Sequence, residues 1–233
     1  MHWAYGVTTI PERRNTTLSS TLKSLSTAGF AEPHLFVDGD SDYASWTRQF
    51  ATQVTMRFPR VQAFANWMLS LVELWCRHPL AERYVIFQDD ILACRNMRSY
   101  LEQMVLHPKT YWNLYTFPSN DGIAKKRKAT RFFDSNQLGF GALGLVFNRQ
   151  GVLDLLMSDH FVTRPACPKN PHKSIDGCVV SALRKAGYRE KCHTPSLLQH
   201  TGEESSISNP KQPKATTFKG ESFDAMELLN GIR

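Results

Sequence analysis

Two adjacent carboxylates, Asp89 and Asp90, are the residues of this sequence best suited to chemistry. They follow the run Tyr84–Gln88, whose residue types favour a buried strand. Like charges side by side at the end of such a strand are electrostatically costly. Mg²⁺ or Mn²⁺ would remove this cost, because either ion binds carboxylate oxygens and can bridge them to a diphosphate. The alternative is a solvated acidic turn, which the preceding apolar run makes the weaker interpretation.

A second candidate metal ligand is His200, in the segment PSLLQHTG near the C-terminus. A single histidine is more often a packed or surface residue than a ligand. Here an apolar strand presents it at a turn of the chain, so it could complete a metal shell from the far side of a cleft.

The segment TTIPERR, at the end of the first predicted strand, is a candidate phosphate site. It offers hydroxyl groups from Thr8 and Thr9 and a guanidinium group from Arg13, just before a predicted helix. Such groups suit a nucleotide or its phosphates. An exposed basic turn explains the same residues, and both interpretations stay open.

Asp176 lies at the start of a predicted helix, where a carboxylate is favourable as a partner of the helix dipole. Its functional alternative is a general base that deprotonates an acceptor hydroxyl.

A basic cluster lies between two predicted strands and could hold a phosphodiester backbone, with Phe132 and Phe133 nearby for stacking on bases. The alternative is a solvated charged face. The cluster consists of Lys125, Lys126, Arg127, Lys128 and Arg131.

The elements that must position these residues alternate between strand-like and helix-like patterns. This alternation predicts an α/β fold, with a mostly parallel sheet that helices cover, in which ligands bind at the carboxyl ends of the strands. We expect one domain over residues 1–207, and 208–233 as a basic tail or a closing segment of the same domain. Predicted strands are 3–10, 34–40, 83–88, 111–117 and 141–148; predicted helices begin at Asn15 (the cap), Val61, Ser99, Arg149 and Ser174.

Composition places the chain among ordinary folded proteins, with 233 residues, 42% hydrophobic residues and a net charge of +7. The basic balance suggests an anionic partner. We expect no membrane partner, because the sequence has no apolar run long enough to span a bilayer and no signal peptide. Five scattered cysteines argue against a disulfide framework and for the cytoplasm, or the host cytoplasm if the protein is viral.

Together these motifs resemble the GT-A-fold glycosyltransferases. The run YVIFQDDI is similar to their metal-binding acidic motif, and most similar to the E-D-D-I form of the branching N-acetylglucosaminyltransferases. PSLLQHTGEESSI resembles the P-S-L-x-Q-H-x-G-x-x-S-S segment of the same group. GFGALGLVFNRQG resembles their glycine-rich strand on the acceptor side.

The resemblance implies a GT-A-like fold, a UDP-sugar donor, a Mn²⁺ or Mg²⁺ cofactor and a role for each motif. Asp90 and His200 would hold the metal, Asp89 would support the metal or the donor, and Asp176 would be the base of an inverting displacement. Gln88 stands where the family pattern has an acid, which removes a charge there. The residues implied at the nucleotide-sugar site are Thr8, Thr9, Arg13, Asp38, Gln88 and Asp89.

Two other function classes stay open. A nucleotidyltransferase also combines an α/β sheet, acids and a metal, but it needs a glycine- and lysine-rich loop after its first strand, which TTIPERR lacks. A basic nucleic-acid-binding module explains the charge but neither the acidic pair nor His200.

For a glycosyltransferase, we expect the acceptor to be a hydroxymethylated pyrimidine such as 5-hydroxymethylcytosine in double-stranded bacteriophage DNA. Lys125 to Arg131 would hold the phosphates, and a target base within a duplex would be flipped out. The alternative acceptor is a bacterial surface saccharide, for which the basic cluster is only a solvated face.

Overall fold

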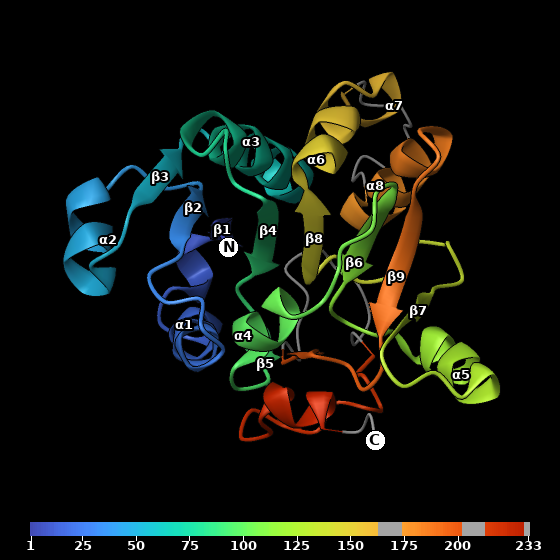
Figure 1. The fold of residues 1–233 in the computed structure, drawn as a ribbon. Helices are drawn as coiled ribbons and strands as arrows, with labels where there is room; N and C mark the ends of the chain where they lie inside the picture. The colour runs from blue at the N-terminus through green and yellow to red at the C-terminus, as the bar shows by residue number, and fades with distance from the viewer. Residues whose placement is uncertain (163–173, 202–212, 231–233) are drawn as a thin grey trace.

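The computed structural model describes residues 1–162, 174–201 and 213–230. Within these ranges a central sheet has eight strands, in the order β3-β2-β1-β4-β8-β6-β9-β7 (Figure 1). Two strands, β8 and β7, run antiparallel to their neighbours, and the other six share one direction. The strands are β1 (Trp3–Thr9), β2 (His34–Asp38), β3 (Val54–Arg57), β4 (Arg83–Gln88), β6 (Thr110–Asn113), β7 (Phe132–Asp134), β8 (Gly144–Asn148) and β9 (Arg189–His193).

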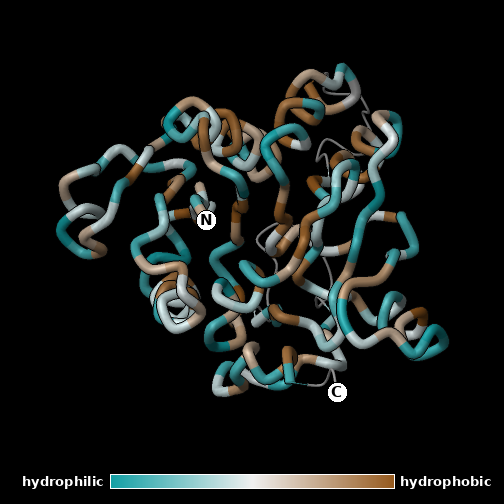
Figure 2. The backbone as a smooth tube through the Cα atoms, in the orientation of Figure 1, coloured by the Kyte–Doolittle hydropathy of each residue, from teal (hydrophilic) through white to brown (hydrophobic). Residues whose placement is uncertain are grey.

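Helices cover both faces of this sheet, which confirms the predicted α/β architecture. Alternate residues of β4 face opposite sides: Val85 and Phe87 join one core, whereas Tyr84 and Ile86 join the other. The first core packs under α1 and α4, and the second under α3, α6 and α8. Figure 2 shows the resulting concentration of hydrophobic residues along the central strands. The helices are α1 (Thr17–Thr27), α2 (Tyr43–Phe50), α3 (Gln62–Arg77), α4 (Met97–Glu102), α5 (Pro118–Arg127), α6 (Arg149–Leu156), α7 (Asp159–Val162) and α8 (Ile175–Lys185).

A second, two-stranded sheet lies beyond the carboxyl end of β4. It pairs β5 (Ile91–Ala93) antiparallel with β10 (Leu198–His200), so that His200 lies opposite Ile91. Figure 1 shows β5 and the C-terminal segment at the edge toward which β4 and β9 point. The polar residues that follow parallel strands therefore share this edge with residues from the end of the chain.

The C-terminal segment adds to the first core through Ala215 and through Ala225, which begins the short 3₁₀ helix η2 (Ala225–Leu229). Asn96 also donates a hydrogen bond to Asp224 at 2.8 Å. The proposed domain boundary at residue 207 stays a prediction, because residues 202–212 lie outside the described ranges. In those ranges we find no helix whose length and apolar character would let it cross a membrane.

Several elements differ from the sequence prediction. The basic cluster, for which no helix was predicted between its two flanking strands, begins within a helix: α5 starts at Pro118, a residue whose fixed φ suits the first helical position, and it ends with Lys125, Lys126 and Arg127. The prediction missed it because α5 has no apolar stripe. It also missed α2, β3, β7 and the charged strand β9. The cap of α1 is Thr16 rather than Asn15.

Of the cysteines that the structure describes, Cys76 is exposed, whereas Cys94, Cys178 and Cys192 are buried; Cys167 lies outside the described residues.

Candidate functional site

The acidic pair lies between β4 and β5, at the carboxyl edge of the central sheet. Asp89 and Asp90 are 3% and 2% exposed, so the interpretation as a solvated acidic turn is wrong. Two ionised carboxylates at such depth need cations or hydrogen-bond donors close by, since burial disfavours their charged forms.

Helix α1 fixes the chain that leaves the acidic pair. The Thr21 hydroxyl accepts from the Ile91 N–H and donates to the Ile91 carbonyl, both at 3.0 Å. One turn later, the Ser24 hydroxyl accepts from the Ala93 N–H at 2.8 Å. Because these hydroxyls satisfy one edge of β5 and β10 pairs with the other, two distant parts of the chain, α1 and β10, fix the backbone that follows Asp89 and Asp90.

Arg13 supplies the positive charge. Its Nη1 atom donates to Asp89 Oδ1 at 2.5 Å and to Asp90 Oδ2 at 2.7 Å. Thr9, the last residue of β1, donates its hydroxyl to Asp89 Oδ2 at 2.6 Å. Since β1 and β4 are neighbours in the sheet, the segment after β1 and the acids after β4 meet at its edge.

The two carboxyl groups differ in electrostatic environment. Burial raises the pKa of Asp89 above its ordinary value, and the neighbouring Asp90 acts in the same direction against Arg13 and Thr9. For Asp90, burial also acts to raise the pKa, but the hydrogen bond and charge of His200 together with Arg13 hold it below the ordinary value. Asp90 is therefore the better anionic ligand of the two.

His200 faces Asp90 from β10, with Nε2 at 3.2 Å from Asp90 Oδ2. Next to it, the Thr201 N–H donates to the Asp90 carbonyl at 2.8 Å. Several buried polar atoms at this place have no hydrogen-bond partner among the described residues: Asp90 Oδ1, His200 Nδ1 and Thr201 Oγ1. Thr201 was not predicted; its position directly after His200 was the only signal in the sequence.

These atoms suit a divalent cation that is shared with a substrate. The described ranges contain no group of three or more His, Cys, Asp or Glu side chains that could hold a metal alone. Mg²⁺, however, is commonly held by one or two carboxylates and completed by substrate phosphates and water. Asp90, through its unpartnered Oδ1, and His200 are the residues of this chain that would hold such a cation.

Three further predicted residues have backbone partners. The Thr8 hydroxyl donates to the Phe87 carbonyl at 3.4 Å, and Gln88 Nε2 donates to the Ala142 carbonyl at 3.2 Å. Both oxygens of Asp38 accept backbone N–H groups at the start of α3, from Val61 at 2.7 Å and Gln62 at 2.8 Å. Their role in binding a nucleotide sugar stays a prediction.

Asp176 is connected to the carboxyl end of β4 by the segment that precedes β8. Its Oδ2 atom accepts from the Gly141 N–H at 2.6 Å, and the next residue, Ala142, is the partner of Gln88. Its Oδ1 atom accepts from Ser174 Oγ and from the Gly177 N–H at the start of α8. Gly141 has a φ of +79°, and an added Cβ would lie 2.4 Å from Tyr115, so glycine is required for this approach.

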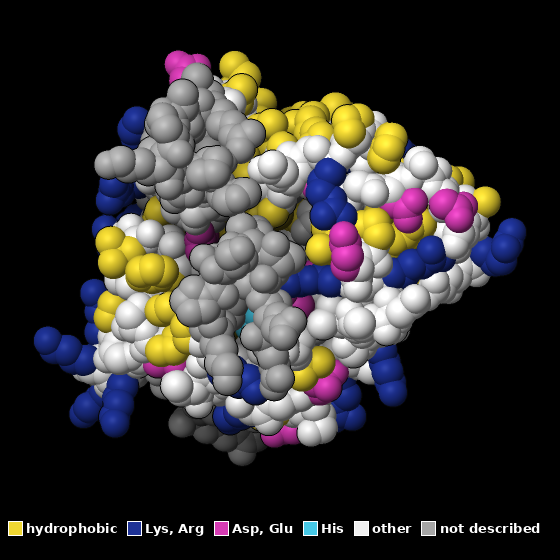
Figure 3. Space-filling model, turned by 180° about the vertical axis from the view of Figure 1, so that it is seen from behind, with side chains coloured by type: hydrophobic (Ala, Val, Ile, Leu, Met, Phe, Trp, Pro, Cys, Tyr) yellow, Lys and Arg dark blue, Asp and Glu magenta, His cyan; other side chains and the backbone are white. Residues whose placement is uncertain are grey.

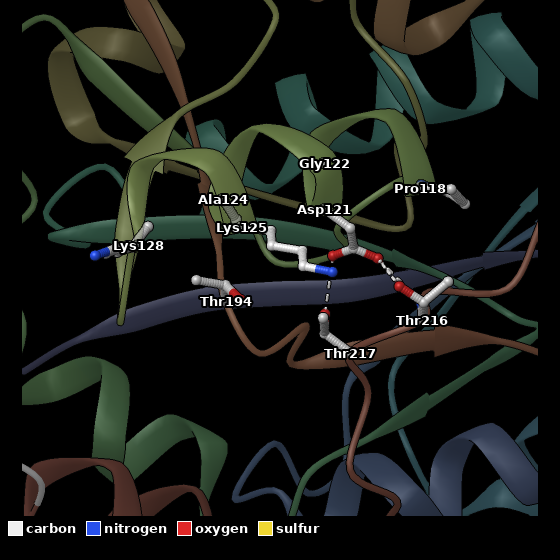
Figure 4. A pocket seen from close by; sticks show the side chains of 10 residues that line it. Pro118, Asp121, Gly122, Ala124, Lys125, Lys128, Thr194, Thr216 and Thr217 are labelled. Carbon is white, nitrogen blue, oxygen red and sulfur yellow. Dashed lines mark hydrogen bonds between the residues drawn. The ribbon is translucent and has the colours of Figure 1, made fainter.

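The basic cluster lies elsewhere, on α5 and after it. Lys125 and Lys128 line a hollow of about 430 Å³, whose far wall is formed by Thr216 and Thr217 hydrogen-bonded to Asp121 (Figure 4). Positive charge at the end of α5 also offsets the helix dipole, which is a sufficient structural reason for it. Arg131 is set apart, because its Nη2 donates to the Leu228 carbonyl at 3.1 Å.

The expected aromatic platform beside this cluster is wrong. Phe133 is buried, and Phe132 stacks on Trp112 with ring centroids 4.3 Å apart. Phe132 is thus half-buried and uses one face within the protein, and Phe133 is not available for base stacking.

Comparisons with known proteins establish the fold. No family model and no curated protein matches the sequence. The structure of GalNAc-T7 with UDP, GalNAc and Mn²⁺ is similar over 85% of this chain, with a TM-score of 0.58 and 10% identity; this chain spans 44% of that one. A nucleotidyl transferase from Methanothermobacter thermautotroptrophicus is similar over 84% of this chain and 88% of its own, with a TM-score of 0.50 and 14% identity. The chain thus has the GT-A-like α/β fold that the resemblance implied.

Replacing Arg13 by Gln is expected to destabilise the protein at neutral pH. The change leaves two buried carboxylates without their cation, which typically costs about 3–5 kcal/mol. Denaturant unfolding of the variant and of Arg48→Gln, an exposed arginine of α2, measures the difference. Equal unfolding free energies for the two variants would show that Arg13 does not neutralise the pair.

Proposed function

We propose that this protein is a metal-dependent glycosyltransferase that uses a nucleotide sugar, with a UDP-sugar as the best donor. The observation that carries the proposal is the contact of Asp90 with His200 and Arg13, buried at the carboxyl edge of a GT-A-like sheet. This arrangement joins the two sequence motifs on which the resemblance rests. It also presents ligand atoms and a guanidinium group where an α/β sheet binds its ligands.

Each part of the site has a place in the transfer. A bound divalent cation would neutralise the charge that develops on the leaving diphosphate. Arg13 would contact the same diphosphate, since a guanidinium group suits phosphate oxygens. The acceptor hydroxyl oxygen would attack the anomeric carbon as the bond to the diphosphate breaks, and the bonding electrons would leave with the diphosphate.

Asp176 would take the proton of the attacking hydroxyl, which gives an inverting displacement. Its Oδ2 atom accepts one backbone N–H, and a carboxylate oxygen has a second lone pair for the proton. The bond to Gly141 would meanwhile fix the direction of that oxygen.

Nucleotidyl transfer is the second candidate function, because one similar structure is a nucleotidyl transferase. The segment after β1 speaks against it, because Ile10 to Arg14 contains no glycine or lysine from which a phosphate-binding loop could be built.

The acceptor is proposed on separate grounds. Lys125, Lys126, Arg127 and Lys128 are exposed together at one end of α5 and suit a polyanion such as DNA with hydroxymethylated pyrimidines. Seen from behind, in Figure 3, Lys and Arg side chains project at several places around the outline of the molecule, including a group at the lower left. A bacterial surface saccharide is the alternative acceptor, for which these charges serve only the helix end and solvation.

With Mn²⁺ and a panel of nucleotide sugars, the protein is expected to release nucleotide slowly from one donor, a UDP-sugar, in the absence of acceptor. Asp90→Asn should lower this turnover by at least about 100-fold, since a metal contributes several kcal/mol to such reactions. Asp134→Asn on β7 is the control, because Asp134 is also ion-paired, with Arg189 and Lys191. Wild-type turnover in Asp90→Asn would contradict the proposal, and pyrophosphate release from a nucleoside triphosphate would favour the second candidate.

DNA that contains 5-hydroxymethylcytosine is expected to gain a hexose-sized mass on the modified base when it is offered with the active donor. Replacing Lys125, Lys126, Arg127 and Lys128 by Gln should weaken DNA binding. The slope of the logarithm of the binding constant against the logarithm of the salt concentration should become less negative by about 0.9 for each lost phosphate contact. Donor hydrolysis should not change. The measurement is mass spectrometry of the digested nucleosides. If the enzyme hydrolyses its donor but the modified base gains no mass, this acceptor is eliminated.

A further inference from the structure

Arg13 contacts both carboxylates through a single nitrogen atom. Nη1 lies 2.5 Å from Asp89 Oδ1 and 2.7 Å from Asp90 Oδ2. No hydrogen bond of Nε or Nη2 is found among the described residues, and the side chain is 17% exposed. Within the described ranges, the guanidinium group thus contacts the acidic pair through one nitrogen, and its other nitrogens make no hydrogen bond that would compete with an anion.

The same carboxylate has one oxygen that Arg13 does not contact. Asp90 Oδ1 is buried and has no hydrogen-bond partner in the described ranges. A buried acceptor without a donor is unfavourable. A cation that bound this oxygen would satisfy it, but it would then share the Asp90 carboxylate with Arg13.

If a divalent cation and Arg13 both bind the Asp90 carboxylate, their positive charges repel each other. A divalent cation on Asp90 would lie within a few ångström of the guanidinium group, where like charges repel strongly. A diphosphate removes this conflict, because its oxygens can bind the cation and, at the same time, the free edge of Arg13. The charges of the described site thus favour the cation and the diphosphate together over the cation alone.

We propose that Arg13 is the resident counter-cation of the acidic pair and makes divalent-cation binding depend on a bound nucleotide diphosphate. Without nucleotide, Arg13 neutralises Asp89 and Asp90 and keeps the cation weakly bound. With nucleotide, the guanidinium group transfers part of its hydrogen bonding to the phosphates, and the cation gains Asp90. This inference rests on the proposed function and concerns the order in which the same site is filled.

Mn²⁺ binding, followed by electron paramagnetic resonance of the free ion, tests the proposal without any turnover. For the wild-type protein, saturating UDP should tighten Mn²⁺ binding at least tenfold. For Arg13→Gln, Mn²⁺ alone should bind at least tenfold more tightly than to the wild type, and UDP should add little further. The control Arg48→Gln, which lowers the net charge equally at an exposed position of α2, should behave as the wild type.

A second variant covers the case in which Arg13→Gln does not fold. Arg13→Lys keeps the charge, so its Mn²⁺ affinity without UDP should stay as weak as that of the wild type. Because lysine lacks the planar fork that can hold the acids and a phosphate together, UDP should tighten Mn²⁺ binding to Arg13→Lys several-fold less than to the wild type. A folded Arg13→Gln that binds Mn²⁺ alone no more tightly than the wild type, or an Arg13→Lys in which UDP tightens Mn²⁺ binding as much as in the wild type, would overturn the role of Arg13. Absence of Mn²⁺ and UDP binding by the wild-type protein would instead overturn the proposed function.

Discussion

The constraint on which this site depends is the burial of two adjacent carboxylates at the end of one strand. Asp89 and Asp90 have almost no contact with solvent, so their charge must be balanced from inside the protein. The parallel pairing of β1 with β4 brings Thr9 and Arg13 to them, and the pairing of β5 with β10 brings His200. The pairing of the strands therefore determines which charged residues surround the acidic pair.

The sequence predicted the parts of the protein in which local pattern and tertiary environment agree. Strand β4 is apolar because both its faces are buried, and the acids after it stand out for that reason. Helix α5 and strand β9 could not be predicted in this way, because α5 has no apolar stripe and REKCH reads as a charged turn. The direction of β8 depends on long-range packing, which no local pattern records.

The same distinction applies to the site. Asp89, Asp90, Thr9, Arg13 and His200 were predicted as site residues, and the structure brings their side chains together. Their partners were not predictable, since the contact of Arg13 with the acids joins residues 76 and 77 positions apart. The basic cluster shows the opposite case: a conspicuous charge run proves to be a helix end, where the backbone alone favours cations. The fold alone does not decide the function, since the similar structures include GalNAc-T7 with UDP, GalNAc and Mn²⁺ and a nucleotidyl transferase.

The most direct measurement of the central claim is a crystal structure of the protein grown with UDP and Mn²⁺, with the metal located by anomalous scattering. The account predicts one strong anomalous peak in coordination contact with Asp90 and His200, bridged to the diphosphate of the nucleotide, with Arg13 hydrogen-bonded to a phosphate oxygen. A nucleotide bound away from the carboxyl ends of β1 and β4, or a metal with no contact to Asp90, would contradict it.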